Sequence, residues 1–423
     1  MTAINKENSK VFLLTLLGML SAFGPFVTDM YLPSLPAMAD YFSASLPMVQ
    51  MGLTTSMIGL ALGQIFFGPL SDKYGRRPLL LVSMVLFIVS TLLCLFAPDI
   101  YSFVTLRLIQ GVAGAGGIVI SRSVATDKFS GKELAKMLAV IGAINGVAPV
   151  AAPVIGGLLT GSVGWQGIFM ILLFIGILLG IGCIRFKESL PTEKRSKTGV
   201  FATFRSFGII VHNRRYMLYV LQLAFAQGIL FAYIASSPFI IQQHYGFSPF
   251  AFSICFAVNA VAIGVAAAIS VKFRRTENGT LTGCIGMLVF AILQMAALYS
   301  GCGFWTYELL MFALLFMMGL TFTASTTLAM DCERRYAGAA SALLGALCFA
   351  SGGIVSPLVG LGDILLSTGV TFVVCAVCSL LCALWAVKRT ALKVFSPLYV
   401  ESLTIKRIFC MTHSLLQCYK TKA

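Results

Sequence analysis

Residues Gly68–Pro78, with the sequence GPLSDKYGRRP, separate two long apolar runs and place four charged side chains between them. Such a stretch is typical of a short loop between two membrane-spanning helices. Short loops rich in Lys and Arg remain on the cytoplasmic side of a membrane, so Lys73, Arg76 and Arg77 predict that this loop is cytoplasmic. The side on which every other loop lies then follows by counting crossings.

The composition excludes a water-soluble protein. Of the 423 residues, 58% are hydrophobic and 11% are charged, and the mean hydropathy is +0.93. A helical span needs roughly 20 apolar residues to cross a hydrocarbon core about 30 Å thick, so twelve spans use up nearly the whole chain. We therefore expect an all-α protein embedded in the lipid bilayer, with its first span over 11–32.

The positions of the cations explain the formal net charge of +15. Of the 30 Lys and Arg residues, only Arg107 and Arg122 lie inside apolar runs, and all others lie in the termini or in loops assigned to the cytoplasm. This is the bias that keeps positively charged loops inside. It predicts that both termini are cytoplasmic. It also argues against nucleic acid as a partner, because the cations form no recognition surface.

A polar stretch divides the chain into two halves. We predict an N-terminal six-helix bundle over 1–184, a cytoplasmic linker over 185–215, a C-terminal six-helix bundle over 216–387 and a basic cytoplasmic tail over 388–423. The sequence Pro357-Leu-Val-Gly360 echoes Pro153-Val-Ile-Gly156 one half-chain earlier, as in transporters built from two related bundles. The tail is compatible with an amphipathic helix on the inner leaflet or with a disordered basic segment, and both interpretations stay open.

Neither a metal nor a nucleotide cofactor is indicated. The 12 Cys are scattered, mostly within apolar runs, and Cys375, Cys378 and Cys382 share one helical face without a second pair of ligands. The sequence contains no phosphate-binding loop of the Walker type. We therefore expect no cofactor and a process driven by the proton gradient.

Four motifs carry a resemblance to a known family. The loop Gly68–Pro78 resembles the signature between helices 2 and 3 of the major facilitator superfamily, with a nearly complete match at its glycine, aspartate and paired arginine positions. The segment from Asp29 to Pro36 is similar to the helix-1 motif of twelve-helix drug:proton antiporters, most closely those of the Bcr/CflA group of multidrug efflux transporters. The other matching residues are Arg107, Gln110 and Gly111 of a helix-4 motif and Gly146, Pro149, Pro153, Gly156 and Gly157 of the helix-5 motif that marks drug antiporters.

The resemblance implies both a fold and a function. It implies a major facilitator fold, with twelve transmembrane helices in two six-helix pseudo-symmetric bundles, in the inner (cytoplasmic) membrane of the cell. It also implies a monomer that exports small amphipathic drugs in exchange for protons and so confers multidrug resistance. Proton-coupled uptake of a small metabolite on the same fold is an alternative. A membrane-embedded enzyme is an alternative of another class, against which the lack of a clustered nucleophile, base and orienting group argues.

Asp29 and Arg107 are the predicted proton-coupling residues. Asp29 lies near the outer end of the first span and Arg107 about two turns into the fourth span from the same side, so their depths are similar. A carboxyl at membrane depth faces the bundle interior, pairs with a cation or takes up a proton. We expect Arg107 to face the cavity and to tune Asp29 electrostatically. The alternatives are an Asp29 wetted from outside and an Arg107 held by helix carbonyls and Gln110.

The charged loop is predicted to control access from the cytoplasm. Gly75 allows a sharp turn, and Asp72 can serve as an anion at a helix N-terminus, which by the resemblance would be that of the eleventh helix. Arg76 or Arg77 would pair with Asp127 and complete a latch. Plain topology charges in a solvated loop are the alternative. The predicted gating residues are Gly68, Asp72, Gly75, Arg76, Arg77 and Asp127.

The helix-5 motif carries no side chain that performs chemistry, so we expect it to act through shape. Pro149 and Pro153 remove backbone donors and bend the helix. The glycines, among them Gly146, Gly156 and Gly157, permit close packing on neighbouring helices. A seal on one side of the membrane or a hinge is the functional interpretation, and ordinary close packing is the alternative.

Polar residues within apolar runs, close to aromatic ones, are the candidates for substrate contact. An aromatic cavity with few polar groups suits amphipathic molecules of varied shape. For each single residue, hydrogen bonding between helices is the alternative. Glu308 is a second candidate protonation site. The predicted cavity residues are Tyr31, Gln110, Asn145, Gln227, Phe231 and Tyr233, and Gln222 and Asn259 are further polar candidates.

Overall fold

The computed structural model describes residues 8–129, 131–195, 207–333 and 337–388. The predicted tail after residue 388 and the middle of the predicted linker lie outside the described residues. All regular structure in the described part is helical. The long helices are α1 (Lys10–Asp29), α3 (Leu46–Tyr74), α4 (Arg76–Leu95), α5 (Ile100–Lys128), α6 (Gly131–Arg185), α8 (Arg214–Phe239), α9 (Pro249–Ser270), α10 (Thr276–Tyr299), α11 (Phe304–Cys332), α12 (Ala337–Leu358) and a final helix over Ile364–Lys388.

The described part of the chain contains 11 helices that are long and apolar enough to cross a membrane. One of them, α6, has 55 residues and contains both the fifth and the sixth predicted spans. At about 1.5 Å per residue it would reach roughly 80 Å, more than twice the hydrocarbon thickness. Gly164 interrupts it with non-helical angles, φ 65° and ψ −171°. The chain turns there, so α6 accounts for two crossings.

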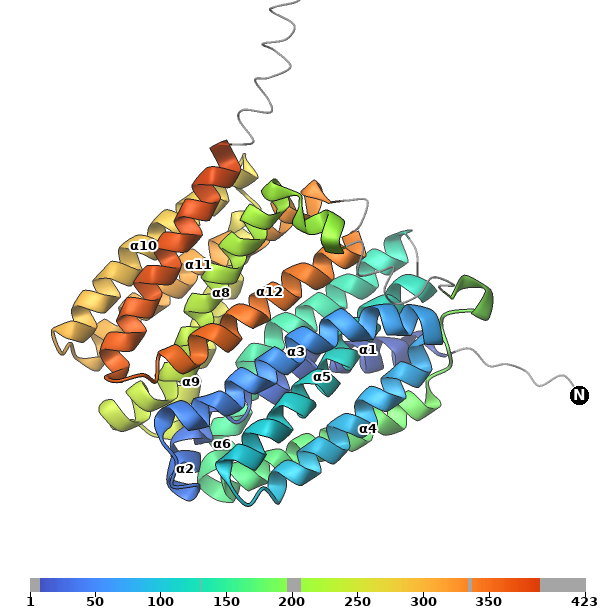
Figure 1. The fold of residues 1–423 in the computed structure, drawn as a ribbon, viewed down its shortest axis with the longest axis horizontal. Coiled ribbons are helices and arrows are strands. Elements are labelled where there is room, and N and C mark those ends of the chain that lie inside the picture. The colour runs from blue at the N-terminus through green and yellow to red at the C-terminus, as the bar shows by residue number, and fades with distance from the viewer. Residues whose placement is uncertain (1–7, 130, 196–206, 334–336, 389–423) are drawn as a thin grey trace, which may run out of the picture.

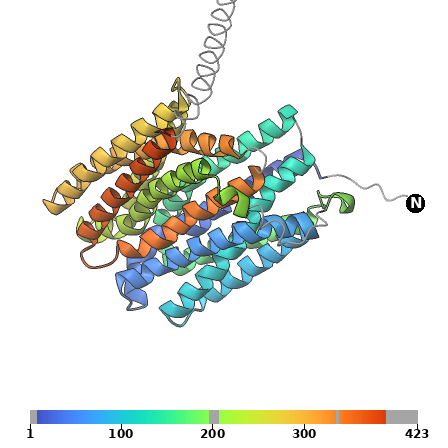
Figure 2. The same ribbon diagram turned by 45° about the horizontal axis from the view of Figure 1, so that its top comes forward.

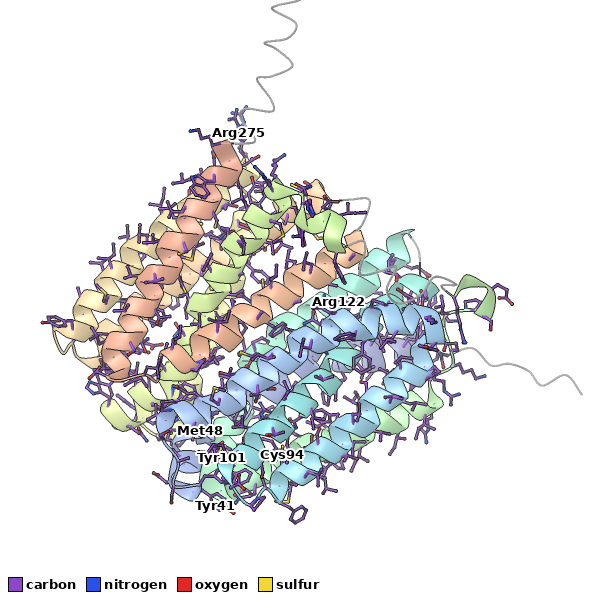
Figure 3. The ribbon with its side chains drawn as sticks, in the orientation of Figure 1. Tyr41, Met48, Cys94, Tyr101, Arg122 and Arg275 are labelled. Atoms are coloured by element: carbon purple, nitrogen blue, oxygen red, sulfur yellow. The ribbon has the colours of Figure 1, made fainter. Side chains whose placement is uncertain are left out.

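The helices run between two ends of the molecule. The basic end carries the segment Gly68–Pro78 and Arg275, and the opposite end carries Tyr41 and Tyr101 (Figure 3). The predicted loop over this segment is shorter than expected, because α3 continues to Tyr74 and α4 begins at Arg76, with only Gly75 between them. An N-terminal half made of α1 and α3–α6 lies beside a C-terminal half made of α8–α12 and the final helix (Figures 1 and 2). The halves meet where α3 packs against α12 and α6 packs against α9.

The first helix ends earlier than the predicted range of 11–32. α1 ends at Asp29 and is followed by the 3₁₀ turn η1 (Leu32–Ser34) and the short helix α2 (Leu35–Tyr41). Pro33 explains this end, because it has no N–H to donate to the carbonyl of Asp29. Asp29 therefore lies at the final turn of α1 rather than one turn inside it.

Side-chain caps fix the start of several helices. The Asp99 carboxylate accepts a hydrogen bond from the Ser102 backbone N–H at 2.8 Å and begins α5, and Ser248 Oγ accepts one from the Ala251 N–H at 3.2 Å and begins α9. Asp99 is exposed, and the hydrogen bond from the Ser102 N–H lowers the pKa of its carboxyl below the usual value. Both caps lie at the opposite end, where they close the short connections between spans.

Glycines allow α3 and α5 to approach closely. A Cβ on Gly111 of α5 would collide with the carbonyl oxygen of Ser56, and one on Gly63 of α3 would lie 2.5 Å from the carbonyl oxygen of Val112. The hydrophobic effect does not drive helix association within lipid, so van der Waals contact between close backbones stabilises the pair instead. Gly114, one turn further along α5, has only Leu60 Cδ2 nearby, at 3.7 Å.

We expect the substitution Gly111→Ala to lower the free energy of unfolding by about 1–3 kcal/mol, because the added methyl group overpacks the contact with α3. Gly114→Ala is the matched control, since its methyl group has room and Ala is a better helix former than Gly. Thermal unfolding of both purified variants in detergent checks this. Equal melting temperatures for the two variants would contradict the assigned contact.

Candidate functional site

A cavity of about 350 Å³ lies between the two halves. Its walls come from α1, α6, α8, α9, α11 and α12, and they are mostly aromatic and aliphatic. Asp29 is the one Asp, Glu, Lys, Arg or His among the described residues that line it. The aromatic lining residues are Phe231, Tyr233, Phe256, Phe322 and Phe349, and the polar ones are Thr28, Asp29, Gln227 and Asn259.

Asp29 lies in the cavity wall at the end of α1. The residue is 6% exposed, and its Oδ1 accepts a hydrogen bond from the hydroxyl of Thr28 at 2.7 Å. No ion pair joins Asp29 to a cation in the part of the chain that the structure describes. A buried carboxylate without a cation is costly. Its charge must therefore be offset by a proton or by a ligand in the cavity.

Arg107 is buried inside the N-terminal half, with 0% of its surface exposed. Its Nε donates to the carbonyl of Gly52 at 3.3 Å, its Nη2 donates to the carbonyl of Val27 at 3.0 Å, and its Nη1 donates to Oε1 of Gln110. The guanidinium carbon lies 4.4 Å from the ring centroid of Tyr31, a favourable cation–π distance. Carbonyls, an amide and a ring therefore stabilise the charge together.

The expected position of Arg107 in the cavity is not what the structure shows. Arg107 is absent from the described lining residues, and no described ion pair joins it to Asp29. The reason is the rotation of α5, which directs this side chain toward α1 and α3, whose carbonyls accept its N–H groups. The geometry matches the alternative interpretation, an arginine held by helix carbonyls and Gln110.

Two further predicted cavity residues lie in the same buried cluster. Gln110 is fully buried and its Nε2 donates to Thr91 Oγ1 at 2.7 Å. The ring of Tyr31 packs edge-on against Phe169, with the centroids 5.8 Å apart. Neither residue is among the described residues that line the cavity, so the structure gives both of them positions between helices.

Three of the other predicted cavity residues line the wall, and one lies outside the described side chains. Gln227, Phe231 and Tyr233 of α8 line the cavity, as does Pro149 of α6. Asn145 lies where side chains are outside the described set, and so does Gly146 of the helix-5 motif. The further polar candidate Gln222 is buried elsewhere in the C-terminal half, where its Nε2 donates to Ser379 Oγ at 3.1 Å.

Several lining residues carried no signal that sequence reasoning could use. Phe256 of α9, Phe349 of α12 and Phe322 of α11 stand among many other phenylalanines in apolar runs. Thr28 directly precedes Asp29, and this adjacency is the one signal in the sequence for the hydrogen bond between them. Which faces of these helices meet the cavity depends on packing.

A network of polar side chains at the basic end surrounds Arg76, which is 5% exposed. Its Nη1 donates to Asp72 Oδ1 at 2.5 Å and to Ser71 Oγ at 2.7 Å, and its Nε donates to Asp127 Oδ2 at 2.9 Å. Asp127 also accepts a hydrogen bond from the hydroxyl of Ser189 at 3.0 Å. Of the two arginines that the sequence offered for Asp127, the structure pairs Arg76.

Glu188 of the linker occupies the N-terminus of α4. Its Oε1 accepts from the backbone N–H of Arg76 at 3.0 Å and its Oε2 from that of Arg77 at 3.1 Å. Gly75 precedes this helix with φ +102°, a conformation that favours glycine. An anion at a helix N-terminus is stabilised by free N–H groups and by the helix dipole. Sequence reasoning missed the contact of Glu188 with α4, because the two lie more than 100 residues apart in the sequence.

Asp72 is predicted to interact with the N-terminus of the eleventh helix. Residues 334–336, which directly precede that helix, lie outside the described residues, so this interaction stays a prediction. Within the described part, Asp72 pairs with Arg76 of its own half. Arg77 donates to the carbonyl of Ile184 at 2.8 Å and is exposed. Gly68 packs beside Val119 of α5, whose Cγ1 would lie 3.6 Å from a Cβ at that position. The hydrogen bonds and ion pairs described for this segment therefore lie within the N-terminal half.

We expect Arg76→Ala to lower the free energy of unfolding by about 3–5 kcal/mol, because it leaves the carboxylate of Asp127, whose side chain is 14% exposed, without its cation. Arg77→Ala is the matched control, with an expected loss of about 0.5–1.5 kcal/mol for one exposed hydrogen bond. Denaturant unfolding of the purified variants measures both. A similar loss in the two variants would show that the network around Arg76 adds no particular stability.

At the opposite end, the helix-5 glycines lie at close contacts. A Cβ on Gly156 would collide with the carbonyl oxygen of Met30, and one on Gly157 would lie 2.9 Å from the carbonyl oxygen of Pro249 in the other half. Two hydrogen bonds also cross between the halves here. Gln50 Nε2 donates to the Ala235 carbonyl and Gln242 Nε2 donates to the Pro33 carbonyl, both at 3.0 Å. These contacts join the two halves at this end.

We expect Gly157→Val to separate the halves at the opposite end, because its side chain cannot fit against α9. Gly161→Val is the control, since nothing lies within 4 Å of a Cβ at Gly161. Spin labels at Tyr101 and Tyr299, which are 67% and 84% exposed, in a background without native cysteines, report the distance. Distance distributions that are identical in both variants would contradict a sealing role for Gly157.

Comparison with known proteins gives matches over most of the chain. A family model described as Major Facilitator Superfamily matches residues 14–357. The uncharacterized MFS-type transporter YdgK of Bacillus subtilis (strain 168) is 39% identical over 355 residues, which are 82% of this chain and 88% of the relative. The bicyclomycin resistance protein homolog of Haemophilus influenzae is 30% identical over 370 residues, or 84% and 90%.

A solved structure has the same fold. It is that of a bacterial homolog to the human lysosomal transporter Spinster in an inward-facing and unoccupied conformation, with a TM-score of 0.74 and 18% sequence identity. The match covers 90% of this chain and 99% of the other. The likeness confirms the expected architecture of apolar helices and, at this identity, shows the fold alone.

Proposed function

Because the chain belongs to the major facilitator superfamily, we propose that it exports small amphipathic drugs in exchange for protons. As a multi-pass membrane transporter of this superfamily, it is not an enzyme. The observation that carries the proposal is the position of Asp29, a buried carboxyl without a cation partner among the described residues, in the wall of a cavity between the halves.

The lining of the cavity supports a drug-like cargo. A volume of about 350 Å³ accommodates a small molecule. Aromatic rings such as Phe231, Phe256 and Phe349 offer apolar contact that tolerates varied shapes, and Gln227 and Asn259 add a few hydrogen-bonding groups. The relative named as a bicyclomycin resistance protein homolog supports an antibiotic as cargo.

Asp29 supplies the coupling in this proposal. When the cavity opens to the outside, the carboxylate takes up a proton and the drug leaves; when it opens to the cytoplasm, the proton leaves and a drug enters. Two alternating sets of contacts hold the two states, with the Gly157 contact closing the opposite end in the present state. The proton gradient provides the energy, so no cofactor is required.

The distribution of Lys and Arg supports a placement in the inner membrane with both termini in the cytoplasm. The basic end is then cytoplasmic and the opposite end is outside. One chain contains both halves and the cavity between them, so a monomer suffices for the proposed cycle.

We expect the wild-type chain, in a host that lacks its own efflux pumps, to raise the concentration of bicyclomycin or another amphipathic antibiotic needed to stop growth. Asp29→Asn should abolish this resistance, because the amide cannot exchange a proton. Asp99→Asn, at an exposed helix cap, is the control and should retain resistance. Transport in inverted vesicles tests the direction of drug movement. An exporter accumulates the drug inside these vesicles, whereas movement of the drug out of them would favour the uptake alternative.

The pH dependence of drug binding gives a sharper test. If proton and drug exclude one another at Asp29, a rise in pH removes the proton and tightens binding, by up to about tenfold per pH unit on the acidic side of the titration. Asp29→Asn should bind with a clearly shallower pH profile. The same pH dependence in that variant and in the wild type would remove Asp29 from the coupling mechanism.

A further inference from the structure

A second carboxyl, Glu308, lies beside the cavity wall in the C-terminal half. Its Oε1 accepts a hydrogen bond from Nδ2 of Asn259 at 2.8 Å. The same Nδ2 donates to the hydroxyl of Tyr233 at 3.0 Å. Asn259 and Tyr233 both line the cavity, whereas Glu308 lies behind them. Asn259 therefore connects this carboxyl to the cavity.

Three buried polar atoms in this group have no hydrogen-bond partner among the described residues. They are Oε2 of Glu308, Oδ1 of Asn259 and the hydroxyl of Tyr307. More than nine in ten buried polar groups in proteins are paired, so these three atoms around one carboxyl leave a place for a partner such as a proton. As a carboxylate oxygen, Oε2 can only accept a hydrogen bond, and no donor faces it among the described residues. A proton bound to Oε2 would make it an O–H group that donates instead.

The surroundings of Glu308 offer no cation. The titratable side chains that act on it electrostatically are Tyr233 of α8, Cys255 of α9 and Tyr307 of α11 itself, all of which are neutral when protonated. No ion pair of Glu308 occurs in the described part of the chain. The Lys and Arg residues of the C-terminal half that the structure describes lie at the basic end, while Glu308 is in the first turns of α11 at the opposite end.

We propose that Glu308 is a second proton-binding residue of this transporter, so that each half supplies one carboxyl and one cycle exchanges two protons for one drug molecule. This inference rests on the proposed function. An O–H bond forms at Oε2 when the cavity is open to the outside and breaks when it is open to the cytoplasm. No other bond changes. Asn259 is the positioning residue, because it holds Oε1 and leaves Oε2 to the proton.

The two carboxyls belong to different helices on different sides of the cavity. Asp29 is held by Thr28 of α1, and Glu308 by Asn259 of α9. They share no hydrogen-bond partner among the described residues. Substitution of Glu308 should therefore remove one proton from the cycle and leave Asp29 in place.

Transport stoichiometry in proteoliposomes tests the proposal. With the membrane potential clamped at zero and a fixed pH gradient, the steady-state bicyclomycin ratio should rise by about 100-fold per pH unit for two protons and by about 10-fold for one. We expect the first value for the wild type and for the control Glu277→Gln, which removes a carboxylate at the basic end. We expect the second for Glu308→Gln, whose amide oxygen can still accept from Asn259. A slope of about 100-fold in Glu308→Gln, or of about 10-fold in the wild type, would overturn the proposal.

Infrared difference spectroscopy tests the same residue without any drug. The purified full chain is taken through the neutral pH range, and the carbonyl stretch of a protonated carboxyl is followed. The band that Glu308 gains and loses should be present in the wild type and in Asp29→Asn and restored in Glu308→Asp, whereas Glu308→Gln should keep only the band of Asp29. If the wild-type spectrum minus that of Glu308→Gln shows no such band, Glu308 does not exchange a proton and the proposal fails. If the band is present but the wild type moves no bicyclomycin, the fault lies with the proposed cargo.

Discussion

The cost of a carboxyl buried between two helical bundles is the constraint on which this structure depends. Asp29 has one neutral hydrogen-bond donor, Thr28, and an otherwise largely apolar wall around it. In such a place a charge is tolerated only while a proton or a ligand offsets it. The remaining architecture holds this group at a fixed point in the wall and controls which side of the membrane can reach it.

The position of Asp29 follows from the end of α1. Pro33 stops the helix just after Asp29, and the buried Arg107 holds the residues on either side of it. Its guanidinium donates to the carbonyl of Val27 and lies against the ring of Tyr31. Arg107 thus acts on Asp29 through the backbone of α1 rather than by a direct charge contact. A carboxyl held in a fixed position is better suited to repeated exchange of a proton for a drug than one on a mobile helix end.

The two ends of the molecule are built in different ways. At the basic end, the described polar network around Arg76 joins the loop to α5 and to the linker, all within the N-terminal half. At the opposite end, glycine contacts and the hydrogen bonds of Gln50 and Gln242 cross between the halves. Contacts between halves must break when the cavity opens, whereas contacts within a half move as one body. This division fits two bundles that tilt against each other.

The sequence by itself determined the membrane embedding, the family and the residues at the two ends, because hydropathy and charge follow directly from the order of residues along the chain. Gln227, Phe231 and Tyr233 could also be predicted as cavity residues. The positions of Arg107, Gln110 and Tyr31 could not. Each residue turns about 100° from the last around a helix axis, and in spans that are apolar on every side nothing in the sequence fixes that rotation. Only tertiary packing decided that Arg107 faces carbonyls, that Glu188 reaches the N-terminus of α4 and that Asn259 joins Glu308 to the cavity.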